Sequence, residues 1–178
     1  MYVINLIGCP GEESGVYAKH IFHKHNFPNV EIISLTETIL ENSIKNNVSF
    51  IKEFRTTDFI QLYKGFQRRL NKAFAERRNV VIDIFGVSNL TRNRLQIDPN
   101  YMQVGILFNR NNEKRKTNLI IEEKVNKILY PESFLNGLLF HNTSISKNNV
   151  IRDNYAWIMN DTDLKPAEWV DFWKRKLV

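Results

Sequence analysis

The fold of this chain is indicated by one stretch near its start, Gly8-Cys9-Pro10-Gly11-Glu12-Glu13-Ser14-Gly15-Val16. The preceding run, Tyr2–Ile7, is mostly apolar and is bounded by Gly and Pro, which is typical of a strand buried on both faces of a parallel sheet. The following residues, 14–25, carry apolar side chains at helical spacing. The stretch is therefore predicted to join a buried strand to a helix N-terminus, where backbone N–H groups can bind an anion.

The rest of the chain alternates between apolar runs and amphipathic patterns. Further strands are predicted over Val30–Ser34, Asn79–Ile84, Tyr101–Phe108 and Tyr155–Met159, and further helices over about 36–46, 57–78, 111–129 and 166–177. Strands that alternate with helices predict an α/β fold, here a single three-layer domain over residues 1–178 with a five-stranded parallel sheet. Residues 141–149 are rich in Asn and Ser and are expected to form a surface loop.

The composition favours a folded intracellular protein. Hydrophobic residues make up 43% of the chain and aromatic residues 12%, which is enough for a core. One cysteine, Cys9, excludes an internal disulfide and is typical of a reducing compartment, so a cytoplasmic protein with no membrane partner is expected. The 25 Lys and Arg residues against 19 Asp and Glu give a net charge of +6, which favours polyanionic partners.

The first loop has the placement of a phosphate-binding P-loop, G-x-x-x-x-G-K-[ST]. Its start, Gly8–Gly11, together with Val80–Asp83, Asn89–Arg92 and Asn109-Arg110, resembles the kinase domain of bacteriophage polynucleotide kinase and its P-loop relatives. Tyr155–Asp161 is more similar to the last strand of guanylate-kinase-type enzymes. The resemblance implies the P-loop kinase fold.

The same resemblance implies roles for residues outside the loop. It implies a lid-like helical region at about residues 110–149, in which Arg110, Lys114 and Arg115 would clamp phosphates, and a magnesium ligand at Asp83. The basic run has a plainer interpretation as a solvated helix face, because acidic residues are interleaved with it. A divalent ion held by Glu12, Glu13 and Asp83 is a further hypothesis.

The loop departs from the P-loop pattern at three positions that matter for chemistry. In this alignment Glu13 stands at the last glycine, Ser14 at the lysine and Gly15 at the metal-binding hydroxyl. Loss of the lysine removes a positive charge, while Glu12 and Glu13 add negative charges beside the same site. Two like charges ~4 Å apart repel by about 1 kcal/mol in water and about 4 kcal/mol at an effective dielectric of about 20. ATP is therefore expected to bind poorly, and no cofactor is expected.

The loop after the second predicted strand departs in a similar way. Thr36 falls near the position of the Asp base of the phage kinase, and the Arg expected nearby is missing. Glu37 would replace the base if the alignment shifted by one residue, but a glutamate in the first turn of a helix also serves as a helix-end charge.

Three functions are compatible with these residues. The preferred one is a degenerate, non-catalytic P-loop kinase-like protein that binds a protein, a nucleic acid or a weakly charged ligand; the phage-like start suggests a viral protein in a host cytoplasm. The rival is an active nucleoside, nucleotide or polynucleotide 5′-kinase that uses ATP and magnesium, with Lys19, Lys24 or a lid arginine replacing the lysine. The third is nucleic-acid binding by the basic residues between Arg68 and Arg94. The sequence predicts no oligomeric state.

Overall fold

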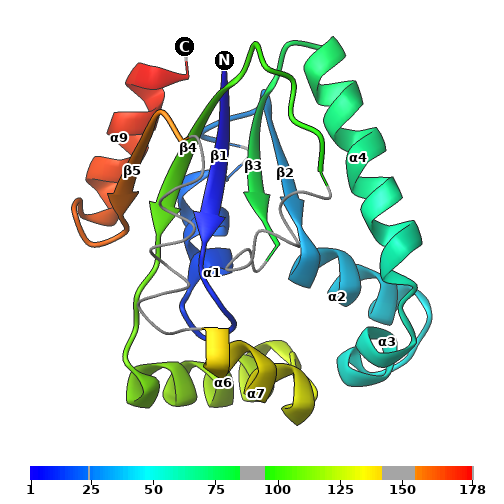
Figure 1. The fold of residues 1–178 in the computed structure, drawn as a ribbon. Coiled ribbons are helices and arrows are strands. Elements are labelled where there is room, and N and C mark those ends of the chain that lie inside the picture. The colour runs from blue at the N-terminus through cyan, green and yellow to red at the C-terminus, as the bar shows by residue number, and fades with distance from the viewer. Residues whose placement is uncertain (24, 85–94, 142–154, 178) are drawn as a thin grey trace.

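The centre of the protein is a five-stranded sheet in which all neighbouring strands are parallel. The structure is a computed structural model that describes residues 1–23, 25–84, 95–141 and 155–177. The strands lie in the order β2-β3-β1-β4-β5 (Figure 1), which confirms the predicted α/β class and parallel sheet. Their bounds are β1 Tyr2–Ile7, β2 Val30–Ser34, β3 Asn79–Asp83, β4 Met102–Leu107 and β5 Trp157–Asn160.

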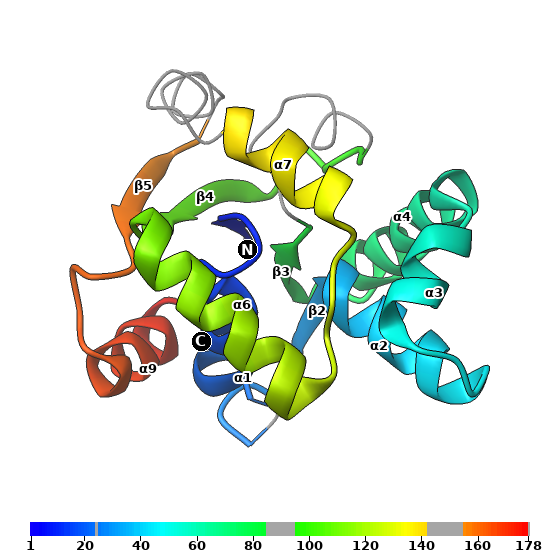
Figure 2. The same cartoon turned by 90° about the horizontal axis from the view of Figure 1, so that it is seen from below.

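Helices cover both faces of the sheet, so the fold has three layers (Figure 1). One face carries α1 (Ser14–Ile21) and α9 (Pro166–Lys176). The other face carries α2 (Leu35–Lys45), α3 (Phe50–Thr56) and α4 (Phe59–Ala75). Two more helices, α6 (Asn112–Asn126) and α7 (Glu132–His141), cross the carboxyl ends of the strands (Figure 2).

Each face of the sheet has its own hydrophobic core. On the α1 and α9 face, Trp169 and Trp173 are almost fully buried and belong to a cluster with apolar residues of the sheet and of α1. On the other face, α4 contributes the apolar stripe that its sequence predicts, and the N-cap Asp58 starts this helix by accepting the N–H groups of Ile60 and Gln61. The inner strands β1 and β3 are buried on both sides, which explains their continuous apolar runs.

Several predicted element bounds are wrong. Helix α1 ends at Ile21 rather than at residue 25, because Phe22 leaves the helix and packs against Phe27, with ring centroids 5.5 Å apart. Helices α3 and α7 were not predicted, and β5 begins two residues later than expected, at Trp157. The predicted surface loop starts inside α7, at His141. Its residues 142–149, as well as Lys24 and Asn89–Arg92, lie outside the described residues.

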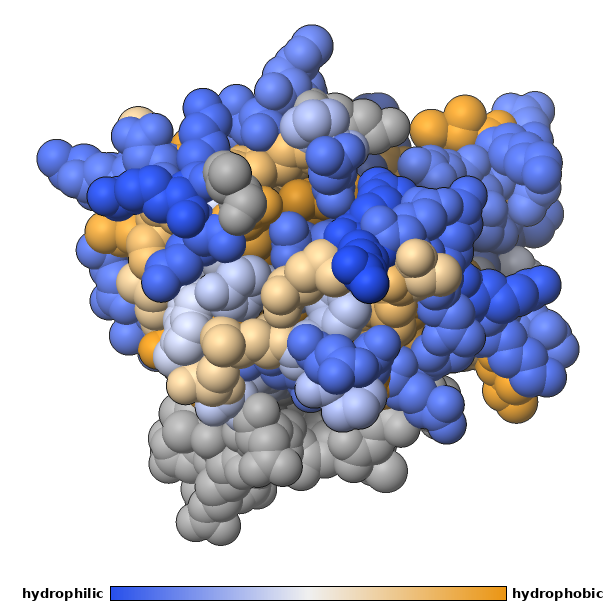
Figure 3. All heavy atoms as spheres, turned by 90° about the horizontal axis from the view of Figure 1, so that it is seen from above, coloured by the Kyte–Doolittle hydropathy of each residue, from blue (hydrophilic) through white to orange (hydrophobic). Residues whose placement is uncertain are grey.

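The two ends of the sheet differ in character. The carboxyl ends of the strands point toward α6 and α7, and the loops that begin there form the candidate site (Figures 1 and 2). At the opposite end hydrophilic side chains predominate, with smaller apolar areas between them (Figure 3). Within the described parts of the chain, no helix is long and apolar enough to cross a membrane.

Candidate functional site

A cavity of about 230 Å³ opens at the carboxyl ends of β1, β2 and β3. Residues of the stretch 8–16 line one side of it, and α6 and the segment after it line another. The charged and polar groups on its wall come from distant parts of the chain. They include Ser14, Lys19, Ser34, Glu37, Asp83 and Glu122. The sheet therefore brings together two of the loops that the sequence marks as candidates.

The backbone of the loop supports its alignment with a P-loop. Gly11 has φ +80° and Glu13 has φ +71°, both in the left-handed region. A Cβ on Gly11 would lie 2.7 Å from the carbonyl oxygen of Arg115, so only glycine fits there. Glu13 adopts a conformation that favours glycine, and glycine is the residue that the motif has at this position.

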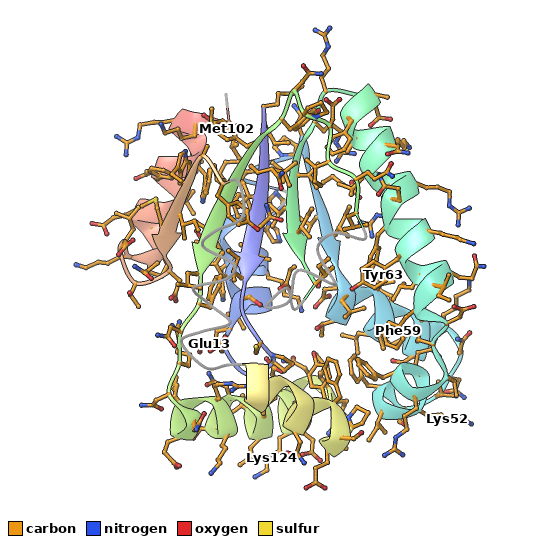
Figure 4. All side chains as sticks on the ribbon, viewed as in Figure 1. Glu13, Lys52, Phe59, Tyr63, Met102 and Lys124 are labelled. Atoms are coloured by element: carbon orange, nitrogen blue, oxygen red, sulfur yellow. The ribbon has the colours of Figure 1, made fainter. Side chains whose placement is uncertain are left out.

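The two adjacent glutamates of the loop point in different directions. Glu12 is fully buried, and its carboxylate accepts the backbone N–H groups of Cys9 at 2.9 Å and of Arg110 at 3.4 Å. Glu13 faces the cavity and α6 (Figure 4), and its carboxylate accepts the Nε–H of Arg110 at 2.9 Å. The expectation that both acids flank a phosphate site therefore needs correction, because Glu12 lies inside the loop.

Ser14, which stands at the position of the P-loop lysine in the alignment, is hydrogen-bonded to the carboxylate of Asp83. The Ser14 hydroxyl donates to Oδ1 at 2.8 Å, and the Ser34 hydroxyl donates to Oδ2 at 3.3 Å. Burial raises the pKa of Asp83 to about 6, although these two hydrogen bonds oppose the shift. A Cβ on Gly15 would lie 3.5 Å from Asp83 Oδ2, so a hydroxyl restored at position 15 would face this carboxylate. The loop after β1 is thus hydrogen-bonded to the Asp that ends β3, and Ser14 stands at the position that the sequence alignment gives to the lysine.

The rest of the cavity wall is predominantly acidic. Burial, with smaller contributions from the charges of Asp83 and Glu13, raises the pKa of Glu122 to about 7. Lys19 reaches the cavity, but its Nζ lies 2.7 Å from Glu37 Oε1. Lys19, a candidate replacement for the P-loop lysine, and Glu37, a candidate base, are therefore paired with each other.

The three basic residues expected to form a lid differ in their hydrogen-bond partners and in their exposure to solvent. Arg110 is held between Glu13 and Asp161, with Nη1 3.0 Å from Asp161 Oδ1, and the bond to Asp161 raises the pKa of Arg110. Arg115 is 3% exposed, and its Nε–H and Nη2–H donate to the carbonyl of Pro10 at 3.4 Å. Lys114 is exposed. Arg110 is therefore paired with two carboxylates, whereas Arg115 bonds one neutral carbonyl and its buried Nη1 has no hydrogen-bond partner among the described residues.

The described residues contain no cluster of metal-binding side chains, and the magnesium role of Asp83 stays a prediction. No group of three His, Cys, Asp or Glu residues among them could hold an ion. Glu12, Glu13 and Asp83 each have separate partners, so the hypothesis of a divalent ion on these three is not supported by the geometry.

Sequence reasoning missed residues that the helices bring to the site. Glu122 carries no motif, and its role depends on how α6 docks. Tyr130 was missed as well; its hydroxyl lies 2.7 Å from the Thr36 hydroxyl, at the expected base position. Asp161 directly follows β5, so the rule that ligand-binding residues follow parallel strands could have identified it.

Comparisons with known proteins show the class of fold. No family model and no curated protein match this sequence. Among solved structures, the chain is similar to a candidate kinase from Chloroflexus aurantiacus, with a TM-score of 0.63, 10% identity, and coverage of 99% of this chain and 98% of that one. It is also similar to a sugar kinase from Janibacter sp., with a TM-score of 0.59, 10% identity, and coverage of 100% of this chain and 96% of that one. Shikimate kinase from Acinetobacter baumannii is similar with a TM-score of 0.51 and 14% identity, over 99% of this chain and 91% of that one.

These similarities define a P-loop kinase-like fold. The loop after β1, the strand-end carboxylate of Asp83 and the strand order agree with that class. At such identities the likeness concerns the fold alone.

Proposed function

We propose that this protein is a non-catalytic member of the P-loop kinase-like fold that acts by binding a ligand without transferring a phosphoryl group. The supporting observation is the bond from the Ser14 hydroxyl to Asp83. A hydroxyl that donates to a carboxylate stands where a P-loop ammonium would meet the phosphates. With Gly15 in the next position, the hydroxyl that binds magnesium is also missing.

The charges around the cavity support the same proposal. Glu13, Asp83 and Glu122 line it, and the Lys19 ammonium is paired with Glu37. A triphosphate is repelled by each ionised carboxylate, by about 1 to 4 kcal/mol for a pair of unit charges ~4 Å apart. Glu122, with a pKa of about 7, carries part of a charge at neutral pH, and Glu13 is partly compensated by Arg110, so Asp83 contributes the main repulsion. Because about 1.4 kcal/mol is a tenfold change in affinity, a few such contacts suffice to abolish useful binding. ATP and magnesium are therefore not part of the proposed function.

The cavity suits a small and weakly charged ligand. Its volume of about 230 Å³ lies below the roughly 300–1,000 Å³ typical of sites for drug-sized molecules. Its wall combines the first turn of α1, which has N–H groups to donate, with carboxyl groups that accept hydrogen bonds. Hydroxyl groups both donate and accept, so a neutral polyhydroxylated molecule matches this wall. A protein or a nucleic acid partner is the alternative if small ligands fail to bind.

An active kinase is the second candidate, and Lys19 is the residue that favours it. Its side chain lines the cavity, so release from Glu37 would give the site an ammonium. A kinase of this kind would require ATP, magnesium and a rotation of the Lys19 side chain.

The phage-like start at Gly8–Gly11 is the basis for proposing a viral protein that acts in a host cytoplasm.

Calorimetric titration with ATP and magnesium tests the proposed function. The wild-type protein is expected to give no saturable heat. The triple variant Glu13→Gly, Ser14→Lys, Gly15→Ser restores the glycine, the ammonium and the hydroxyl facing Asp83. It should bind ATP with magnesium at least about tenfold more tightly than the wild type does. Ser14→Ala is the matched control, because it changes the same position without adding a charge. Submillimolar binding by the wild type would contradict the proposal.

A further inference from the structure

The strand β2 forms one edge of the sheet, because β3 alone pairs with it among the described strands. An edge strand presents backbone N–H and C=O groups on its outer side, and a strand of another chain can pair with them. The sequence of β2, Val30–Ser34, is rich in β-branched residues and carries one charge, at Glu31. Such a segment pairs with other strands when it is accessible, so this edge needs protection.

The outer side of β2 is accessible in the described structure. A cavity of about 690 Å³ lies along the strand, and residues of α1, α2 and α4 form its other walls. Helix α4 runs beside this edge (Figure 1), and its residue Arg69 lines the cavity and is exposed. The cavity therefore opens to solvent beside the strand.

Arg69 is bonded to the backbone of this edge. Its Nη2–H donates to the carbonyl oxygen of Ile32 at 2.6 Å, and its Nε–H donates to Glu31 Oε1 at 2.8 Å. Arg78, which directly precedes β3, contacts the other carboxylate oxygen, with Nη1 3.2 Å from Glu31 Oε2. One planar guanidinium thus holds a main-chain acceptor and a side-chain acceptor of β2 at once.

The Ile32 carbonyl is one of the groups that an added strand would use. Alternate residues of a parallel strand direct their backbone groups to opposite sides. The Val30 N–H is bonded to the Phe27 carbonyl in the turn before the strand, at 3.3 Å, and not to β3. Ile32 lies two residues further on and therefore directs its carbonyl to the open side, where Arg69 covers it.

We propose that Arg69 closes the edge of β2 to strand addition by a second copy of this chain. Two copies related by a twofold axis would bring their β2 strands together antiparallel, so the edge can serve as its own partner. An incoming strand has to displace the guanidinium from Ile32 and to remove charged groups from water, which opposes the pairing. The inference goes beyond the proposed function and does not depend on the ligand of the cavity.

Sedimentation of Arg69→Ala over about a hundredfold range of protein concentration tests the proposal. The mass of the wild type should not depend on concentration, whereas the mass of the variant should rise toward that of a dimer. The dissociation constant of self-association should fall at least about tenfold. Arg68→Ala is the matched control, because it removes the same charge from the preceding, exposed residue. A folded Arg69→Ala that associates no more than Arg68→Ala would overturn the proposal.

A second variant and a second measurement keep the test decisive if Arg69→Ala unfolds. Arg69→Met keeps a long apolar side chain but has no donor for Ile32 or Glu31, so it should associate in the same way. Hydrogen exchange at residues 30–34 should slow at least about tenfold on association, because strand addition protects these amides, whereas unfolding exposes them. Association without this protection, or a folded Arg69→Met that stays monomeric, rules the proposal out. ATP binding by the wild type would contradict the proposed function alone.

Discussion

Asp83 is a buried carboxyl group with neutral hydroxyls as its bonded donors. It is 3% exposed and accepts hydrogen bonds from Ser14 and Ser34. Hydroxyls compensate the desolvation of a negative charge less well than a cation would, which is why the pKa of Asp83 rises to about 6. Burial therefore makes the ionised form of Asp83 less stable in the folded protein than in the unfolded chain.

The free energy of unfolding is expected to fall as the pH rises from about 4 to about 7. Asp83 titrates at 3.8 ordinarily and at about 6 in the folded protein, so the native state holds an extra proton between these values and loses that advantage above them. The shift amounts to about 3 kcal/mol at about 1.36 kcal/mol per pKa unit. Urea unfolding of Asp83→Asn across this range should show a smaller pH dependence, with the part due to Glu122 remaining. Identical pH profiles for variant and wild type would disprove the assignment.

The sequence predicts which residues lie at the site only where the position of the backbone, at the end of a strand, brings them there. Ser14 and Asp83 follow β1 or end β3, and parallel strands bring such residues to one edge of the sheet. The directions of Glu12 and Glu13 could not be predicted in this way. They depend on where Arg110 lies, and Arg110 is placed by the docking of α6.

At the scale of elements, α6 is a fixed layer of the described structure. Arg110, which precedes the helix, is bonded to Glu13 of the loop and to Asp161 after β5, and the middle of α6 is joined through Asn118 to Gly11. The first half of α6 contacts the loop, and Glu122 and Asn126 in its second half line one wall of the cavity. The lid-like role that the sequence resemblance implies for residues 110–149 stays a prediction.

Gly11→Ala should separate α6 from the loop. The new Cβ would lie 2.7 Å from the Arg115 carbonyl oxygen, and the φ of +80° is unfavourable for alanine. We expect a loss of about 2–4 kcal/mol in the free energy of unfolding. The control is Gly65→Ala in α4, where a Cβ meets nothing within 4 Å and should stabilise the helix by up to about 1 kcal/mol. Chemical unfolding of both variants measures the difference, and equal stabilities would contradict the docking.

The sequence pattern of a short helix such as α3 covers too few residues to be recognised. Helix α3 covers only Phe50–Thr56 and begins at the N-cap Ser49, whose side chain accepts the Lys52 N–H. Phe50 and Phe54, four residues apart, are buried against the core beside α4. Tertiary packing stabilises such a short helix more than its own propensity does, so a sequence pattern alone rarely reveals it.

At the scale of the whole molecule, the charge of the chain and the charge of the cavity have opposite signs. The net charge is +6, but Glu13, Glu37, Asp83 and Glu122 line the cavity at the end of the sheet. Composition indicated a preference for polyanions, whereas the fold concentrates acidic groups where a P-loop kinase binds its triphosphate. The overall charge therefore could not predict the ligand of the site, because the arrangement of the strands decides which charges meet there.

Release of phosphate from ATP by the pure protein, measured with and without magnesium, tests the non-catalytic function most directly. We expect no release above that of buffer at any magnesium concentration, because the site lacks the P-loop ammonium and hydroxyl. Magnesium-dependent release that disappears in Asp83→Asn would contradict the proposed function, since it would mean that Asp83 still serves phosphoryl transfer.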